Sequence, residues 1–227
     1  MGEKYDRRAI MKRVYIVAEG QTEQEFINSL ISPYLRNFGI LSVTPILIRT
    51  SRTGRGGMVN YQHLYNTVKM LLGSSQADFI VTTFIDFYRL PANMPQYAQS
   101  MSLPNKISQV ETLETAIDQS ISDRRFFSYI QLHEFEALLF SDNKGFEYYF
   151  PEFFAKETAS IISAYDNPED INTSPEGAPS KRLLAIKSDY NKVLEGNLIA
   201  LEIGIKYILE KCPRFALWIN KIIEHSK

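Results

Sequence analysis

The sequence predicts an α/β fold with a central, mostly parallel sheet of about four strands, flanked by helices and followed by a helical C-terminal part. Apolar runs rich in β-branched and aromatic residues alternate with helix-periodic segments as far as the run at 126–132. The run at 78–87 is almost continuously apolar, which is typical of a strand buried on both faces of a parallel sheet. From about 151 onward the periodicity is helical.

The first strand and the helix after it lie in the stretch from Arg13 to Glu23. Its β-branched residues favour a strand, and Gly20 permits a tight turn after the acid that ends the strand. Thr22 is expected to cap the following helix, with Glu25 three positions later completing a capping box. Apolar residues at helical spacing continue this helix to Ile31.

The remaining elements follow from the same periodicities and from loop composition. The proline-bearing segment 89–104 predicts a lid or an ordered excursion rather than a simple connector. Because no linker separates the parts, residues 12–227 are expected to form one domain with a helical subregion from about 151, after a disordered leader at 1–11. The further elements expected are strands at 40–50, 78–87 and 126–132, helices at 61–72, 108–121 and from 133, and two or three helices within 180–225.

The composition limits the classes of function and partner. Lys and Arg total 25 and Asp and Glu total 26, so nucleic acid would need a local basic patch rather than a global attraction. The single cysteine, Cys212, excludes an internal disulfide and predicts a cytoplasmic setting, in which it is a buried structural thiol. No apolar run approaches the roughly 20 residues of a membrane span and no signal-peptide pattern opens the chain, so no membrane partner is expected.

Acidic residues follow three of the predicted strands. Glu19 follows the first, Asp86 ends the third, and Glu134 and Glu136 follow the fourth. The carboxyl ends of neighbouring parallel strands meet at one edge of a sheet, and hard divalent cations prefer carboxylate oxygens. The spacing is therefore compatible with a shared Mg²⁺ site, and helix capping with surface ion pairs is the alternative.

Six segments of the chain form a distinctive combination: Val17–Glu23, Ile85–Tyr88, His133–Ser141, Pro175–Leu183, Ile203–Gly204 and Cys212–Pro213. Together they resemble the Toprim-like fold, which is Rossmann-like, and more closely a prokaryotic family of uncharacterised proteins in that superfamily. The resemblance covers nearly the whole chain, from Met11 to Ile223. Toprim domains occur in topoisomerases, primases, recombination proteins and the nuclease part of OLD-type proteins.

This resemblance implies a glutamate after the first strand and Asp-x-Asp after the third, all serving Mg²⁺ (or Mn²⁺). Glu19 and Asp86 match that pattern, but Tyr88 stands where the second aspartate is expected. Glu134 or Glu136 is a candidate replacement from the adjacent strand end. Residues two positions apart do not share a helix face, so one of the two is expected to reach the metal, and Glu134 is preferred because it is nearer the strand.

Two further residues near these acids have both a catalytic and a structural interpretation. Glu23 is a general base or an additional metal ligand, or else it stabilises the first turn of its helix. His133 is a proton shuttle near neutral pH, or else a hydrogen-bonded structural residue at the strand end.

Basic residues in two segments are candidates for substrate binding. Lys181 and Arg182 follow Ser180, which is expected to cap a helix and leave backbone N–H groups for a phosphate. Arg52 and Arg55, with Arg49, lie in a glycine-bearing loop suited to tracking a nucleic-acid strand. Ordinary solvated charges are the alternative for this loop.

The function predicted from these observations is a Mg²⁺-dependent, Toprim-like nuclease or related phosphodiester-processing protein that binds nucleic acid. The resemblance also implies action with a partner ATPase in phage or mobile-element defence. The alternative is a catalytically degenerate Toprim-like module that binds nucleic acid or a partner protein, a reading motivated by Tyr88. The aromatic residues between Phe146 and Phe154 are either core or the interface of a homo-oligomer.

Overall fold

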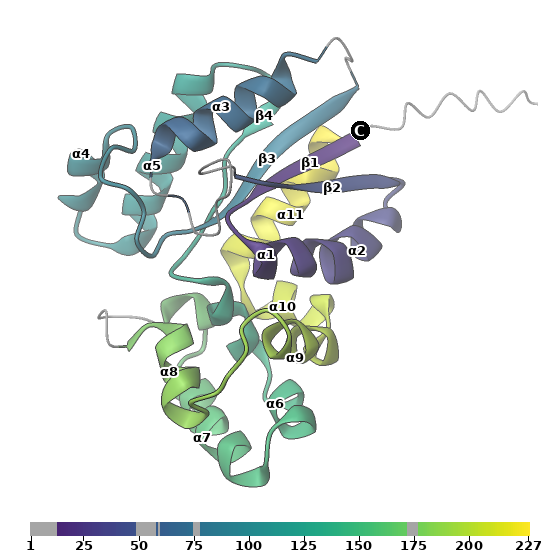
Figure 1. Ribbon diagram of the computed structural model, residues 1–227, viewed down its shortest axis with the longest axis vertical. Helices are drawn as coiled ribbons and strands as arrows, with labels where there is room; N and C mark the ends of the chain where they lie inside the picture. Colours follow the sequence, from purple (N-terminus) through teal and green to yellow (C-terminus); the bar gives the residue numbers. More distant parts are fainter. Residues whose placement is uncertain (1–12, 49–57, 59, 75–77, 172–176) are drawn as a thin grey trace, which may run out of the picture.

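A parallel β-sheet forms the centre of the computed structural model, which describes residues 13–48, 58, 60–74, 78–171 and 177–227 (Figure 1). The strand order is β2-β1-β3-β4, β5 also pairs with β3, and all of these pairings are parallel. The fold class predicted from the sequence is confirmed. The strands are β1 (Arg13–Ala18), β2 (Ser42–Leu47), β3 (Phe79–Asp86), β4 (Phe126–Phe127) and β5 (Ile130–Gln131).

Helices cover the sheet and form a second region beyond its carboxyl edge (Figure 1). Those of the first half are α1 (Gln21–Phe26), η1 (Ile27–Ile31), α2 (Ser32–Arg36), α3 (Tyr61–Leu72), α4 (Tyr97–Met101) and α5 (Lys106–Ile121). Those of the second half are η2 (Phe135–Ser141), α6 (Lys144–Tyr149), α7 (Glu152–Ser163), η3 (Pro168–Asp170), α8 (Pro179–Ile186), α9 (Glu195–Ile203), α10 (Ile205–Lys211) and α11 (Pro213–His225).

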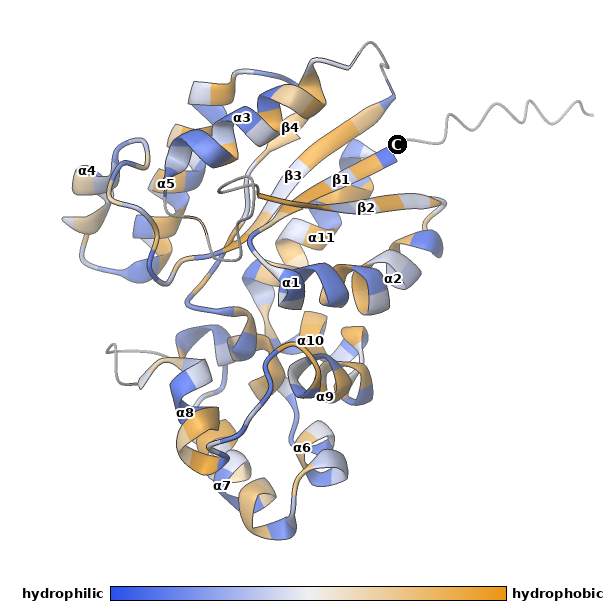
Figure 2. Ribbon diagram, in the orientation of Figure 1, coloured by the Kyte–Doolittle hydropathy of each residue, from blue (hydrophilic) through white to orange (hydrophobic). Residues whose placement is uncertain are grey.

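Two apolar clusters occupy the two faces of the sheet. Val14 and Ile16 of β1 belong to the cluster that includes side chains of α1, η1, α2 and α11. Val17 points the other way and belongs to the cluster formed with α3 and α5. Figure 2 shows the apolar colouring of β1 and β3 between these helical layers. Every residue of β3 is buried, as its continuous apolar run predicts.

The fourth predicted strand is divided into β4 and β5 by Ser128 and Tyr129. At this break the side chain of Thr83 takes the place of the backbone hydrogen bonds between strands. The Tyr129 N–H donates to Thr83 Oγ1, and Thr83 Oγ1 donates to the Tyr129 carbonyl; both hydrogen bonds are 2.7 Å long. The helix expected directly after this strand is the 3₁₀ helix η2, which begins at Phe135. Its backbone therefore presents side chains at a tighter spacing than an α-helix does.

The capping box predicted at the first helix is wrong. The helix begins two residues earlier than the pattern suggested, with Gly20 rather than Thr22 at the N-cap and no side-chain cap. Thr22 is buried instead, and its carbonyl accepts a hydrogen bond from Asn197 of α9. Tertiary packing against α9 thus overrides the local capping signal. The helix then continues through the π turn η1 into α2.

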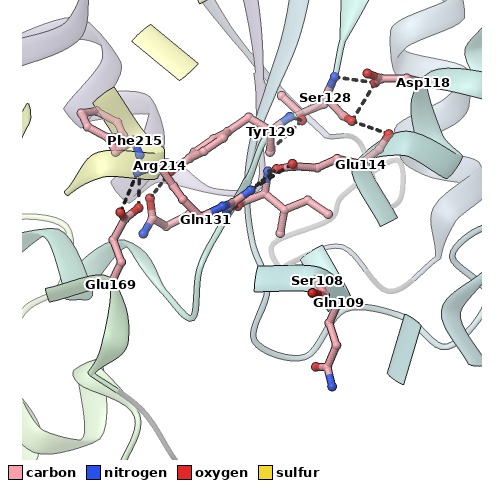
Figure 3. Close-up of polar contacts among 12 residues, drawn as sticks. Ser108, Gln109, Glu114, Asp118, Ser128, Tyr129, Gln131, Glu169, Arg214 and Phe215 are labelled. Atoms are coloured by element: carbon pink, nitrogen blue, oxygen red, sulfur yellow. Dashed lines mark hydrogen bonds and ion pairs between the residues drawn. The ribbon is translucent and has the colours of Figure 1, made fainter. Parts of the chain in front are cut away.

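Helix α11 returns from the helical region to the sheet, and a buried polar network fixes its N-terminus (Figure 3). The backbone N–H groups of Arg214 and Phe215 donate to the Glu169 carboxylate at 2.8 and 3.1 Å. The Arg214 guanidinium binds both oxygens of Glu114 on α5, and Glu114 also accepts from the Ile130 N–H. One arginine thereby joins α5, β5 and α11.

The aromatic residues of α6 and α7 are divided between core and surface. Phe146 and Phe150 are buried, whereas Tyr148 and Phe153 are 71% and 67% exposed. The buried members support the core interpretation, and an interface formed by the exposed members stays a prediction. The segment 89–104 contains α4, which packs against α5, so it is an ordered excursion.

The sequence analysis also predicts a disordered leader and no membrane-spanning segment. The leader expected at 1–11 lies outside the described residues. No helix among the described ranges is long and apolar enough to cross a membrane.

Cys212 is expected to be inert to thiol reagents while the protein is folded. The residue is fully buried, and burial raises the pKa of its thiol above the ordinary value, so almost no thiolate is present near neutral pH. Because the chain has one cysteine, an Ellman titration at about pH 8 should detect one thiol in denaturant and none in the native protein. Fast reaction of the native protein would contradict this burial.

Candidate functional site

The first two acids of the site stand at the carboxyl ends of adjacent parallel strands. Glu19 follows β1 directly and Asp86 is the last residue of β3. In the register of these strands Ala18 lies opposite Phe84, so the two strand ends reach the same edge of the sheet. Glu19 Oε1 accepts from the Met58 N–H at 3.2 Å, and Asp86 Oδ1 accepts from the Phe135 N–H at 3.0 Å. The sequence prediction that these acids share an edge therefore has a geometric basis.

Two more carboxylates lie at this edge, one from α1 and one from η2. Glu23 is buried in the first turn of α1, where the missing side chain of Gly20 leaves room for it: a Cβ at position 20 would lie 3.2 Å from Glu23 Oε2. Glu136 is fully buried in η2. We refer to Glu19, Glu23, Asp86 and Glu136 as the carboxylate cluster.

Lys192 lies among these carboxylates and was missed by sequence reasoning. It belongs to the turn between α8 and α9, beside the carboxyl edge of the sheet. Its Nζ lies 3.2 Å from Glu136 Oε2, 3.7 Å from Asp86 Oδ2 and 3.8 Å from Glu23 Oε1. The local sequence gives no signal for this role, because the lysine reaches the cluster only through tertiary contacts.

Negative charge exceeds positive charge in the cluster. In the part of the chain that the structure describes, Lys192 is the one basic side chain with ion pairs to these acids. Glu136 is the extreme case: its carboxylate is fully buried, and its one ion pair among the described residues is with Lys192, 3.2 Å from Oε2. A buried carboxylate that shares a single ammonium with two other acids is costly, so the cluster is suited to a further cation.

The pKa values of the cluster reflect this imbalance. Burial, opposed by Lys192 and reinforced by Glu134, raises the pKa of Glu136 to about 7. Burial also raises the pKa of Asp86 well above its ordinary value, and burial with repulsion from Glu23 raises that of Glu19. Burial alone would lower the pKa of Lys192, but the carboxylates, led by Asp86 and Glu136, raise it instead.

Glu134, the metal ligand preferred from the sequence, binds Ser180 instead. Its Oε2 accepts from the Ser180 N–H at 3.0 Å and its Oε1 from the Ser180 hydroxyl at 2.9 Å. The carboxylate thus occupies the N-terminus of α8, whose N-cap is Ala178, so the expectation that Ser180 caps this helix is wrong. Glu136, rather than Glu134, is the residue of this pair that lies next to Asp86 and Lys192.

The predicted basic residues lie apart from these ion pairs. Arg182 donates to the Gly177 carbonyl at 2.8 Å and lies against the Tyr165 ring, so it holds the start of α8. Lys181 is exposed on the same helix. Arg52 and Arg55, with Arg49, lie outside the described residues.

The contacts of His133 fit its structural interpretation, and a role as proton shuttle stays a prediction. Its backbone is left-handed, with φ of 70°, and its carbonyl accepts from the Tyr88 N–H at 2.8 Å. Burial and the nearby Lys106 lower the pKa of its ring to about 4, while a hydrogen bond with the backbone of Glu169 opposes the shift. The ring is therefore neutral at pH 7. The ring of Tyr88 lies against the guanidinium of Arg89.

The carboxylate oxygens of the cluster suit a hard divalent cation, but in this structure they are not arranged to bind one. Carboxylate oxygens are the ligands that Mg²⁺ prefers, and the buried Glu136 carboxylate shares the Lys192 ammonium with Asp86 and Glu23. Within the described ranges, however, no three acidic, histidine or cysteine side chains stand close enough to hold a metal ion together. The ammonium of Lys192 occupies the space between three of them.

Comparison with known proteins defines the family. The model of the family described as "Domain of unknown function (DUF4276)" matches residues 18–223. The chain belongs to this family. The DUF4276 match begins at the last residue of β1 and ends within α11, so it includes every residue of the carboxylate cluster and Lys192.

Solved structures offer distant similarities to this DUF4276 chain. The C-terminal region of the Xanthomonas campestris pv. campestris OLD protein has 14% sequence identity and a TM-score of 0.48, with 96% of this chain and 95% of that chain covered. The C-terminal region of the Burkholderia pseudomallei OLD protein has 16% identity and a TM-score of 0.45, with 95% and 97% covered. No curated protein matches the chain.

Proposed function

We propose that this DUF4276 protein is a Mg²⁺- or Mn²⁺-dependent phosphodiester-processing enzyme of the Toprim-like type, acting on nucleic acid. The observation that carries the proposal is the convergence of Glu23, Asp86 and Glu136 on a single lysine at the carboxyl edge of a parallel sheet, where Glu19 directly follows the neighbouring strand. Ligand sites of open α/β sheets lie at this edge. The resemblance of Glu19 and Asp86 to the Toprim acids supports the same assignment.

Each residue of the cluster has a role in this proposal. Asp86 and Glu136, with Glu19, would hold the cation through carboxylate oxygens, and Glu23 would complete the ligand set or take a proton from water. A divalent cation there would polarise a phosphoryl oxygen and lower the pKa of a bound water. Glu134 holds the N-terminus of α8 through its hydrogen bonds with Ser180. Lys181 is exposed in the first turn of that helix and is a candidate phosphate contact.

The proposed function also includes binding partners. Nucleic acid as substrate, a partner ATPase and a role in phage or mobile-element defence are supported by the sequence resemblance alone. A homo-oligomer is supported by the exposed Tyr148 and Phe153.

A nuclease assay with matched variants tests the proposal. The purified protein is expected to cleave DNA or RNA with Mg²⁺ or Mn²⁺ and not with EDTA. Glu19→Gln is expected to reduce cleavage at least about 100-fold, because it removes a charged ligand. Glu25→Gln, an exposed acid in the same N-terminal segment, should retain wild-type activity. Absence of cleavage on every substrate, or equal cleavage by Glu19→Gln, would refute the assignment.

A second candidate function is a non-catalytic module that binds nucleic acid or a protein. Two observations favour it: Tyr88 stands where a second aspartate is expected, and Lys192 already pairs with three of the acids. This alternative predicts no heat of Mg²⁺ binding in calorimetry, together with partner or nucleic-acid binding that survives Glu19→Gln.

A further inference from the structure

Lys192 occupies the place of a cation. Its ammonium lies between 3.2 and 3.8 Å from oxygens of Glu23, Asp86 and Glu136, which come from α1, β3 and η2. An ammonium group offers one positive charge, whereas a divalent cation would offer two to the same oxygens. Lysine therefore neutralises the cluster only in part.

Buried polar atoms around Lys192 are incompletely satisfied. Glu136 Oε2 lies 3.2 Å from the ammonium but shares it with two other acids of the cluster, while Glu136 Oε1 and the Tyr190 hydroxyl have no hydrogen-bond partner among the described residues. Tyr190 lies two positions before Lys192 in the same turn, and its hydroxyl rests over Gly196, where a Cβ would come within 2.6 Å of it. Such groups are ordinarily satisfied by protein, water or an ion. The site is thus incomplete with the lysine in place.

The turn that carries Lys192 is held mainly by bonds within itself and to the start of α9. Glu195 accepts from the Asn191 N–H at 2.7 Å and pairs with Lys187, and Asn191 Oδ1 accepts from the Leu194 N–H. Leu194 is 60% exposed, and the Lys192 side chain itself is 36% exposed. An outward swing of the lysine would therefore break its own ion pairs without opening the apolar core.

We propose that Lys192 is an internal competitor for the divalent cation: its ammonium closes the carboxylate cluster, and metal binding requires the side chain to leave. The proposal rests on the metal-binding function proposed above. It explains why the acids stand at one edge of the sheet and yet do not form a ligand set as they are arranged here. Lys192 would then set the cation concentration at which the site fills.

Isothermal titration calorimetry with Mg²⁺ and with Mn²⁺ tests this inference without relying on activity. Lys192→Met keeps much of the side-chain volume and removes the charge, so it is expected to bind Mn²⁺ at least about tenfold more tightly than the wild type. Lys206→Met makes the same charge change on the exposed face of α10 and should leave the affinity unchanged. Lys192→Arg retains the competitor and should bind no more tightly than the wild type.

Thermal unfolding gives an independent readout of the same competition. Without metal, Lys192→Met should melt below the wild type, because the acids lose their counter-charge. Added Mn²⁺ should raise its melting temperature more than that of the wild type, since stabilisation grows with ligand concentration over Kd. Far-UV circular dichroism confirms that the variant is folded at the start.

The outcomes separate this inference from the function on which it rests. Tighter binding by Lys192→Met supports the competition. Equal or weaker binding by a folded Lys192→Met, with Mn²⁺ still bound by the wild type, overturns the competition and leaves the proposed metal site intact. If neither the wild type nor Lys192→Met binds a divalent cation, the proposed function itself fails.

Discussion

Asp86→Asn is expected to weaken Mn²⁺ binding and metal-dependent cleavage at least about 100-fold while leaving the fold no less stable than the wild type. Asp86 is the acid at the end of the central strand, and it faces Lys192 at 3.7 Å. Its Oδ1 accepts from the Phe135 N–H, and an asparagine oxygen can keep that bond. The substitution therefore removes charge with little change of shape.

The sign of the stability effect follows from the pKa of Asp86. Burial raises this pKa well above the ordinary value, with Lys192 opposing the shift and the other acids adding to it. An acid whose folded pKa is raised destabilises the fold when the pH rises above its unfolded pKa. A neutral asparagine removes that cost at pH 7. Loss of function with retained stability is the pattern of a functional residue rather than a structural one.

Calorimetry with Mn²⁺ and urea unfolding, run on the same samples, measure the two effects. Asp166→Asn changes an exposed aspartate outside the cluster and should alter neither quantity. Wild-type Mn²⁺ affinity in Asp86→Asn would contradict the assignment of Asp86 as a ligand. A large loss of stability would instead show that the carboxylate serves the fold.

Arg214→Met is expected to destabilise the protein by about 3–5 kcal/mol, the usual result of removing one partner of a buried ion pair. Glu114 would remain, largely buried, without the guanidinium that binds both its oxygens. Arg214 also donates to the Ile130 carbonyl at 3.2 Å, so the contact between α11 and β5 would weaken as well (Figure 3). The effect is expected to be on stability, because the side chain of Arg214 bonds Glu114 and Ile130 and neither belongs to the carboxylate cluster.

Urea unfolding monitored by fluorescence measures this change through Trp218, the single tryptophan, which lies one turn along α11 from Arg214. Lys156→Met, which removes an exposed pair with Glu152 on α7, is the matched control and should change stability by less than about 0.5 kcal/mol. Equal effects of the two substitutions would mean that the buried network does not determine how α11 docks.

The α/β architecture could be predicted because its signals are local and repeated. The apolar run of β3 specifies a strand buried on both faces, and acids at strand ends follow directly from sequence order. The first helix was placed correctly in type, yet its cap was wrong. Thr22 has the right chemistry for a cap, but packing against Asn197 of α9 buries it at the second helical position.

The composition of the site was less predictable, because it depends on contacts between distant segments. Glu136 of η2 reaches the same Lys192 ammonium as Asp86, while Ser180 of α8 binds Glu134. No sequence pattern identifies the partner that draws Glu134 away. Lys192 lies in an ordinary polar turn, and only the folded chain brings its ammonium among the acids.

A crystal structure with Mn²⁺, located by its anomalous scattering, would show directly whether the carboxylate cluster binds metal. We expect a peak bound by Asp86 and Glu136 at the carboxyl edge of β1 and β3, with the Lys192 ammonium displaced from its present position. A well-ordered cluster that keeps all three Lys192 ion pairs at saturating Mn²⁺, with no peak among its carboxylates, would rule out the proposed metal site.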